Sequence, residues 1–159
     1  MRLLIHAVGR MKAGPERELV ARYLNRFAKT APAVGLDFAG VTEIAESQAR
    51  SAEQRMREEA ERLESFAGDA LLVLLDERGK NLTSPAFADY LSRHNDGGRR
   101  SLVIAIGGAD GHDPSLREKA DLLLSFGALT WPHQLVRVML AEQLYRASTI
   151  LTNHPYHRV

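Results

Sequence analysis

The chain has 159 residues, of which 45% are hydrophobic and 26% charged, as is ordinary for a globular protein. It contains no cysteine, which excludes disulfides, thiolate metal ligands and cysteine nucleophiles and fits a cytoplasmic location. A formal net charge of +1 excludes binding of nucleic acid through overall charge, so a polyanion would need a local basic patch. No apolar run reaches the roughly 18 residues that cross a membrane, and we expect a single domain over 1–159.

The chain begins with a strand pattern followed by a helix pattern. Residues 3–8 (LLIHAV) form a short apolar run that predicts a strand. Leu19, Tyr23 and Phe27 then recur every four residues, which predicts a helix over 16–29 with these side chains on one face. The same alternation of element types continues along the chain.

A second strand and a charged helix come next. Residues 34–41 (VGLDFAGV) alternate apolar with small or polar side chains, as a half-buried strand does. Residues 47–66 have few apolar side chains among many Arg and Glu, which predicts a long surface helix. We interpret its charges as a solvated face and not as a nucleic-acid site.

Two continuous apolar runs dominate the middle of the chain. Residues 70–76 (ALLVLLD) predict a central parallel strand that ends in a charged loop. The pair Ser84-Pro85 has the form of an N-cap and first helical residue, and it predicts a helix through 94. Residues 99–108 predict a second buried strand that ends in two glycines.

The last third repeats this arrangement. Asp113-Pro114 predicts the start of another helix, and residues 122–127 (LLLSFG) predict a third buried strand. Pro132 then begins the longest apolar helix, 133–151. Strands that alternate with helices indicate an α/β fold with a mainly parallel sheet.

In such a sheet, ligands bind beyond the carboxyl ends of the strands. Distinctive segments follow Leu75, Ile106 and Leu124, and the second contains Gly107 and Gly108. Their spacing is not the dinucleotide-binding G-x-G-x-x-G, and phosphate-binding P-loop, nucleophile-elbow and H-E-x-x-H zinc patterns are also missing. The six histidines have no convincing metal-ligand spacing, so we expect no metal.

The last helix carries charges within an apolar sequence. A helix that is apolar all round is buried on all sides, so in a small domain we expect one face to meet a second subunit. Glu142 and Arg146 have the spacing of a structural ion pair. His133 and Arg137 lie one turn apart, and Arg137 would need either a partner or an anionic ligand in such surroundings.

Four segments carry a resemblance to a known family: LLDERGKNLTSPAFADYL, VIAIGGADG, LSFGALTWPHQLVRVMLAEQLYRA and NHPYHR. Together they resemble the bacterial ribosomal RNA large subunit methyltransferase H family, which are 23S rRNA (pseudouridine 1915-N3)-methyltransferases of the SPOUT superfamily. The resemblance covers nearly the whole chain, is most specific over 124–146 and is weakest over 40–68, where no function is assigned.

The resemblance implies a SPOUT-type α/β fold with a C-terminal trefoil knot, the knot and cofactor site lying within about 70–159. It also implies a homodimer that binds S-adenosylmethionine and acts on 23S rRNA within the large ribosomal subunit or the assembled ribosome. One departure is Gly127-Ala128, where other members commonly carry Ser and Lys or Ala. The positions that would bind the cofactor are Leu75, Gly107, Phe126, Gly127, Ala128, Leu129, Thr130 and Trp131.

Methylation of a ring nitrogen requires positioning of the reactants and stabilisation of developing negative charge. The candidates for catalysis are His133, Arg137, His157 and Arg158, with Asp76 or Glu142 as an alternative base. Tyr156 offers a surface on which a base could stack. The candidates for RNA binding are Arg137, Arg146, Tyr156, His157 and Arg158.

Two other functions stay open at this point. The first is an RNA- or ribosome-binding module of the same fold that has lost catalysis, and the apparently intact cofactor segments disfavour it. The second is a nucleotide-binding reductase, which the missing glycine fingerprint disfavours.

Overall fold

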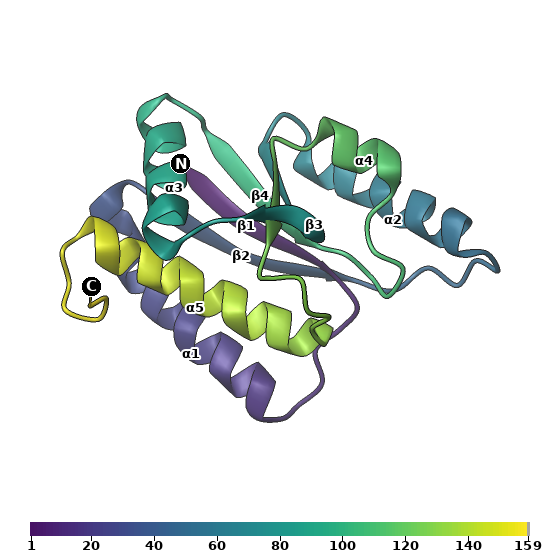
Figure 1. Ribbon diagram of the computed structural model, residues 1–159, viewed down its shortest axis with the longest axis horizontal. Helices are drawn as coiled ribbons and strands as arrows, with labels where there is room; N and C mark the ends of the chain where they lie inside the picture. Colours follow the sequence, from purple (N-terminus) through teal and green to yellow (C-terminus); the bar gives the residue numbers. More distant parts are fainter. Residues whose placement is uncertain (159) are drawn as a thin grey trace.

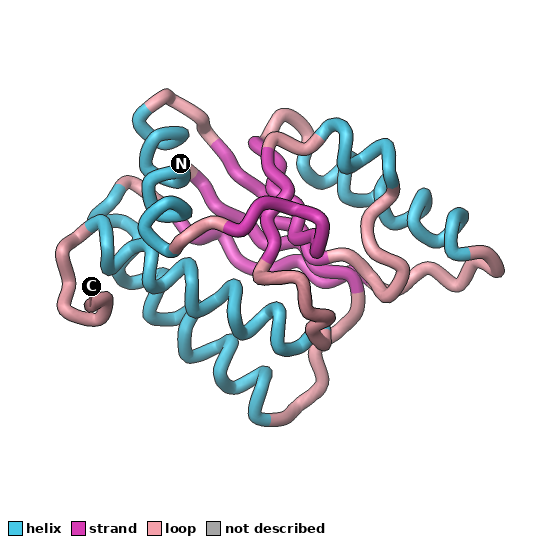
Figure 2. The backbone as a smooth tube through the Cα atoms, in the orientation of Figure 1, coloured by secondary structure: helices cyan, strands magenta, loops and turns pink. Residues whose placement is uncertain are grey.

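The computed structural model describes residues 1–158, which form one sheet covered by helices on both faces (Figure 1). The sheet has the order β2-β1-β4-β3-β5, and its strand pairs are all parallel (Figure 2). The expected α/β fold with a parallel sheet is therefore confirmed. The strands are β1 (Arg2–Val8), β2 (Asp37–Ile44), β3 (Leu71–Asn81), β4 (Ser101–Ile106) and β5 (Leu122–Ser125).

The helices divide between the two faces of the sheet. One face carries α1 (Pro15–Thr30), α3 (Ser84–Asp96) and α5 (His133–Leu151), and the other carries α2 (Ala52–Ala67) and α4 (Pro114–Lys119) (Figure 1). Alternate residues of the central strands face each layer: Leu71 and Val73 pack with the first group, Leu72 and Leu74 with the second. Burial on both faces explains the continuous apolar runs.

The first half of the chain shows two differences from the predicted boundaries. The strand predicted over 34–41 begins only at Asp37, because residues Ala31–Val34 form a short 3-10 helix that ends at Gly35. The charged helix begins at Ala52 and not at residue 47, since Ser51 caps it by accepting a hydrogen bond from the backbone N–H of Gln54. As predicted, α2 lies at the surface.

The predicted caps in the second half are partly confirmed. Asp113 caps α4, which is only six residues long. The N-cap of α3, however, is Thr83 and not Ser84, and the hydroxyl of Ser84 instead donates to Gln143 on α5 at 2.7 Å. The long apolar helix α5 begins directly after Pro132, as predicted.

The segment after Leu75 does not form the simple charged loop that was predicted. Leu75 and Lys80 both pair with Leu124 of β5, so residues 76–79 leave the ladder and the chain then returns to it. A Cβ at Gly79 would lie 2.6 Å from the backbone of Leu123, so this segment lies directly against β5. Among the described residues, no helix is long and apolar enough to cross a membrane.

Candidate cofactor and substrate site

A cleft of about 370 Å³ lies beyond Leu75 of β3 and at the carboxyl ends of β4 and β5; we call it the strand-end cleft. It brings together three segments far apart in the sequence, which follow Leu75, Ile106 and Leu124. Of the predicted cofactor-binding positions, it is lined by all except Ala128, which is exposed on the same loop. The positions that line it are Leu75, Gly107, Phe126, Gly127, Leu129, Thr130 and Trp131.

The walls of the strand-end cleft are mostly apolar side chains and backbone. Ile106 and Leu124 are buried, whereas Leu129 is 71% exposed and Trp131 38% exposed. The hydroxyl of Ser125 accepts a hydrogen bond from the backbone N–H of Gly127 at 3.1 Å and so holds the start of the loop. Gly127 has a φ of 119°, a conformation that side chains rarely adopt, so a glycine suits this position.

Two buried histidines lie behind the glycine turn, which we define as residues 107–111. His6 and His112 are 1% and 7% exposed, and the Nε2 atoms of both have no hydrogen-bond partner within residues 1–158. Burial lowers the pKa of His112 to about 4 and also lowers that of His6. Both imidazoles are therefore neutral at physiological pH and form a polar but uncharged support.

Two carboxylates that line the strand-end cleft, those of Asp76 and Asp110, are each paired with an arginine. Asp76, an alternative base, is only 8% exposed; its carboxylate faces Arg117 at 3.7 Å and accepts a hydrogen bond from the backbone of Arg78 at 2.9 Å. Asp110 pairs with Arg55. Sequence reasoning missed both arginines, because nothing in their local pattern distinguishes them from solvated surface charges.

His133 and Arg137 lie one turn apart on α5, as predicted, but in different surroundings. His133 is exposed and lines the strand-end cleft. Arg137 is buried and bonded to Glu43 and to the backbone oxygens of Gly9 and Val8. Burial of Glu43 opposes its ionisation, but hydrogen bonds from Arg137 and Met11 outweigh this effect and lower its pKa.

The C-terminal tail, residues 152–158, folds back onto the end of α5. The Tyr156 hydroxyl donates to Glu142 at 3.0 Å, and the Tyr156 ring lies 4.7 Å from that of Tyr145. Arg146 stacks over Tyr156 at 4.8 Å and forms the predicted ion pair with Glu142 at 2.6 Å. The second alternative base, Glu142, is thus already occupied by three partners, since the Gln143 amide also donates to it at 2.8 Å.

The rest of the tail is less buried. His157 is half-buried, with its Nδ1 3.3 Å from the Arg146 guanidinium, and Arg158 is exposed. Asn153 takes a φ of 54°, which turns the chain back along the helix. Burial and hydrogen bonding of the Tyr156 hydroxyl with Tyr23 and Glu142 raise the pKa of Tyr156, so its phenol keeps its proton.

The predicted catalytic residues do not form one cluster within a single chain. The strand-end cleft lies at the start of α5, whereas the tail lies at its other end (Figure 1). With 19 residues, α5 is about 28 Å long. His133 is therefore far from His157 and Arg158 of the same chain.

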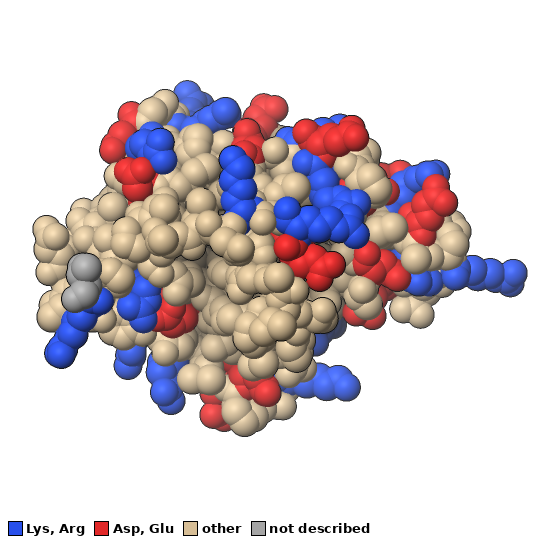
Figure 3. Space-filling view, in the orientation of Figure 1, with Lys and Arg blue, Asp and Glu red and all other residues tan. Residues whose placement is uncertain are grey.

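A second hollow, which we call the α5 groove, has a volume of about 610 Å³. It runs between α1, α5 and the start of α3, and its apolar side chains include Leu19, Leu82, Val138 and Met139. Figure 3 shows a broad uncharged area on this face of the molecule. Within residues 1–158, no group of three His, Asp or Glu side chains could hold a metal ion.

Comparisons with known proteins agree with this architecture. A family model described as "Predicted SPOUT methyltransferase" matches residues 1–157. The chain is 65% identical to ribosomal RNA large subunit methyltransferase H of Mesorhizobium japonicum, with 99% of each chain covered. It is 62% identical to the proteins of the same name from Brucella anthropi and Sinorhizobium medicae, again over 99% of each.

Among solved structures, the SpoU methyltransferase AviRb from Streptomyces viridochromogenes, in complex with AdoMet, aligns with 96% of this chain and 61% of its own. That alignment has 14% identity and a TM-score of 0.39. The full-length matches at high identity are the informative ones. The chain belongs to the SPOUT methyltransferases and, among them, to the ribosomal RNA large subunit methyltransferase H family.

Proposed function

We propose that this protein uses S-adenosylmethionine to methylate N3 of pseudouridine 1915 in 23S rRNA of the large ribosomal subunit. The observation that carries the proposal is the strand-end cleft, where the segments after Leu75, Ile106 and Leu124 meet. The full-length relatives named ribosomal RNA large subunit methyltransferase H support the same substrate class. We infer that the activity is cytoplasmic, where ribosomes are found.

The lining of the strand-end cleft suits a nucleoside cofactor. Its volume of about 370 Å³ lies in the range of small-molecule sites, and Leu75, Leu129 and Trp131 provide apolar walls. The backbone of residues 126–131 offers N–H and C=O groups to an adenine edge. Bound S-adenosylmethionine supplies a methyl group that its sulfonium makes electrophilic.

The chain itself contributes positioning and charge stabilisation. His133 stands at the mouth of the strand-end cleft, where its imidazole can donate to a uracil oxygen as N3 loses its proton. Since an arginine can only donate, Nδ1 of His157 accepts from Arg146, and a neutral His157 then carries its proton on Nε2. In this arrangement His157 acts as a hydrogen-bond donor to the substrate and not as a base.

The separation of the tail from the strand-end cleft supports a site shared between two subunits. In a twofold-symmetric homodimer formed through the α5 groove, the tail of one subunit would reach the cleft of the other. Tyr156 would then offer its ring to an unstacked base, while Arg158 meets RNA phosphate. Arg146 holds the tail in place through Glu142 and Tyr156.

We also propose that the C-terminal region forms the trefoil knot that the family resemblance implies. The support is the path of β3, whose residues 76–79 leave the ladder opposite Leu124 and whose Gly79 lies against the backbone of Leu123. A chain segment that lies across β5 in this way can enclose the strand. The knot would hold the three segments of the strand-end cleft together.

The deciding experiment separates methyl transfer from a non-catalytic RNA-binding module and from a reductase. We expect calorimetry to detect binding of S-adenosylmethionine and not of NADPH. Mass mapping of 23S rRNA from cells that lack the protein should show the loss of one methyl group at pseudouridine 1915. Binding of neither cofactor, with the methyl group still present, would establish the binding module instead.

A net charge of +1 argues against tight binding of naked RNA and favours a composite surface on the ribosome. Purified protein should therefore methylate intact large subunits or ribosomes faster than free 23S rRNA. Equal rates on both substrates would contradict this part of the proposal.

A further inference from the structure

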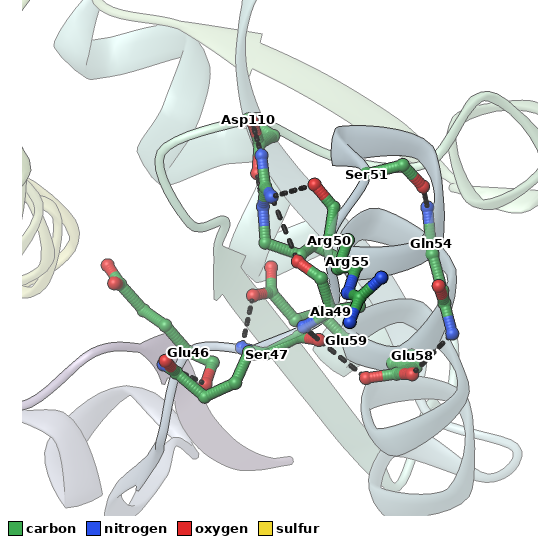
Figure 4. Close-up of polar contacts among 11 residues, drawn as sticks. Glu46, Ser47, Ala49, Arg50, Ser51, Gln54, Arg55, Glu58, Glu59 and Asp110 are labelled. Atoms are coloured by element: carbon green, nitrogen blue, oxygen red, sulfur yellow. Dashed lines mark hydrogen bonds and ion pairs between the residues drawn. The ribbon is translucent and has the colours of Figure 1, made fainter.

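Arg55, near the start of α2, ties three parts of the molecule together (Figure 4). Its Nε and Nη2 atoms donate to the two carboxylate oxygens of Asp110 at 2.7 and 3.0 Å. Its Nη1 donates to the backbone oxygens of Ala49 and Arg50 at 3.0 and 3.3 Å. One guanidinium thus joins α2 and the segment before it to the glycine turn.

Glu59, one turn further along α2, packs against the same glycine turn. A Cβ on Gly108 would lie 2.8 Å from Oε2 of Glu59, so only a glycine leaves room for this carboxylate. The other oxygen of Glu59 accepts a hydrogen bond from the backbone N–H of Ser47 at 3.0 Å. Glu59 is 7% exposed, so its position is fixed by packing as well as by this bond.

These contacts fix both halves of the glycine turn. Gly108 rests on Glu59, Asp110 is held by Arg55, and the backbone N–H of Gly111 closes the turn by donating to Gly108 at 3.0 Å. All five residues of the turn line the strand-end cleft, as does Met56 on α2. The position of this wall therefore depends on α2, which otherwise lies at the surface.

We propose that Arg55 is a positioning residue for cofactor binding, which sets the glycine turn at the distance that S-adenosylmethionine requires. The inference rests on the proposed function, because it takes the strand-end cleft as the cofactor site. It gives a role to residues 40–68, for which the sequence offers none. Arg55 acts through Asp110 and needs no contact with the cofactor itself.

The small contribution of this ion pair to the stability of the fold distinguishes a positioning role of Arg55 from a purely structural one. The Arg55 and Asp110 side chains are 30% and 25% exposed, and ion pairs so accessible to water add little to the stability of a fold. Removing the pair should therefore leave the protein folded while the turn loses its tether. Lysine cannot replace Arg55 fully, because one ammonium cannot engage both oxygens of Asp110 and two backbone carbonyls together.

The test compares Arg55→Ala with Arg57→Ala in the full-length protein. Arg57 lies on the same helix in an ion pair with Glu53, and these side chains are 64% and 79% exposed. Calorimetry with S-adenosylmethionine should show the Kd raised on the order of tenfold for Arg55→Ala, by less for Arg55→Lys, and unchanged for Arg57→Ala. In rRNA methylation, KM for S-adenosylmethionine should rise with kcat at saturation largely kept.

A double variant distinguishes two ways in which Arg55 could affect cofactor binding: by fixing the position of the glycine turn, or by neutralising the charge of Asp110. If Arg55 serves only to neutralise that carboxylate, Arg55→Ala combined with Asp110→Ala should restore wild-type affinity, and the proposal is overturned. A tether instead predicts that Asp110→Ala alone and the double variant bind as weakly as Arg55→Ala. Should Arg55→Ala fail to fold, the comparison of Asp110→Ala and Arg55→Lys with Arg57→Ala decides in the same way.

Wild-type affinity in folded Arg55→Ala also overturns the inference. Leu129→Asp, on the opposite wall, distinguishes this from failure of the proposed function. If Leu129→Asp abolishes binding while Arg55→Ala does not, only the role of Arg55 is wrong. If both bind S-adenosylmethionine as the wild type does, the strand-end cleft is not the cofactor site and the proposed function fails with the inference.

Discussion

At the scale of single residues, the geometry divides the predicted catalytic set. Arg137 was a candidate because an arginine in an apolar helix needs a partner, and the structure supplies that partner in Glu43 and two backbone oxygens. With its guanidinium bonded on two sides and buried, Arg137 joins α5 to the ends of β1 and β2. His133, by contrast, keeps an accessible imidazole at the strand-end cleft.

Arg137→Ala should therefore mainly destabilise the fold. It leaves Glu43 without its guanidinium and two backbone oxygens without a donor, and we expect a loss of about 2 kcal/mol in the free energy of unfolding. Urea denaturation measures the loss, and methylation below the melting range measures catalysis. Wild-type stability together with a large fall in kcat would instead support a catalytic role for Arg137.

His112 predicts an acid-sensitive fold. Burial lowers its pKa from 6.5 to about 4. Between these two pH values the unfolded chain binds a proton at this histidine and the folded chain does not. Stability is then fully present above pH 6.5 and falls by about 3 kcal/mol as the pH drops towards 4. His6, whose pKa is also lowered, adds to the same trend.

Denaturation curves between pH 4 and 7 test this dependence. His112→Gln should flatten the curve because the group that titrates is gone, whereas the exposed His133→Gln should leave it unchanged. An equal slope in the wild type and in His112→Gln would contradict the assignment.

At the scale of elements, the sequence predicted the order of strands and helices and the sites where the central strands end. The reason is that burial on both faces leaves continuous apolar runs such as 102–106, whose ends are visible as glycines or charges. The segments after Leu75, Ile106 and Leu124 could accordingly be assigned to one edge of the sheet. Most of the predicted cofactor positions line the resulting cleft.

What the sequence could not predict depends on contacts between distant residues. The pairing of Leu124 with both Leu75 and Lys80 has no local signal, so the return of β3 was taken for a charged loop. Arg55 and Asp110 are 55 residues apart, and in the sequence Arg55 looks like the other surface charges of α2. The position of the tail could not be predicted either. Its contacts with Glu142 and Arg146 hold it far from the strand-end cleft of its own chain, and no local pattern indicates these contacts.

Arg158→Ala tests the tail as an element of the substrate site. The side chain is exposed at the end of the folded tail, so its loss should cut methylation of the large subunit severalfold while leaving dimerisation and S-adenosylmethionine affinity unchanged. Single-turnover assays and calorimetry measure the two effects. Arg26→Ala, another arginine near Tyr145, is a control that should retain activity. Full activity of Arg158→Ala would argue against the tail.

At the scale of the whole molecule, the site and the dimer are expected to depend on each other. The α5 groove is apolar, and its residues Val138 and Met139 are half-buried. A tail that reaches a second cleft requires a partner on this face. The catalytic unit would then be the pair of subunits, each supplying a cofactor cleft to the tail of the other.

Met139→Glu should consequently produce a monomer. A carboxylate in the α5 groove would have to leave water when the subunits associate, which costs several kcal/mol without a partner charge. Sedimentation should show half the mass, with the helix content by circular dichroism unchanged and methylation lost. If Met139→Glu formed a dimer of wild-type stability, the subunit interface would have to lie on another face.

The strand-end cleft has a further consequence for folding, since three strands must be paired before its walls exist. A ligand that binds only when β3, β4 and β5 have all docked binds the native state and not the unfolded chain. By mass action, S-adenosylmethionine at 100 times its Kd should then add about 2.7 kcal/mol to the unfolding free energy. A melting temperature that rises with cofactor concentration would show that the cofactor binds only the chain with its sheet formed. An unchanged melting temperature would mean that binding does not require the formed sheet.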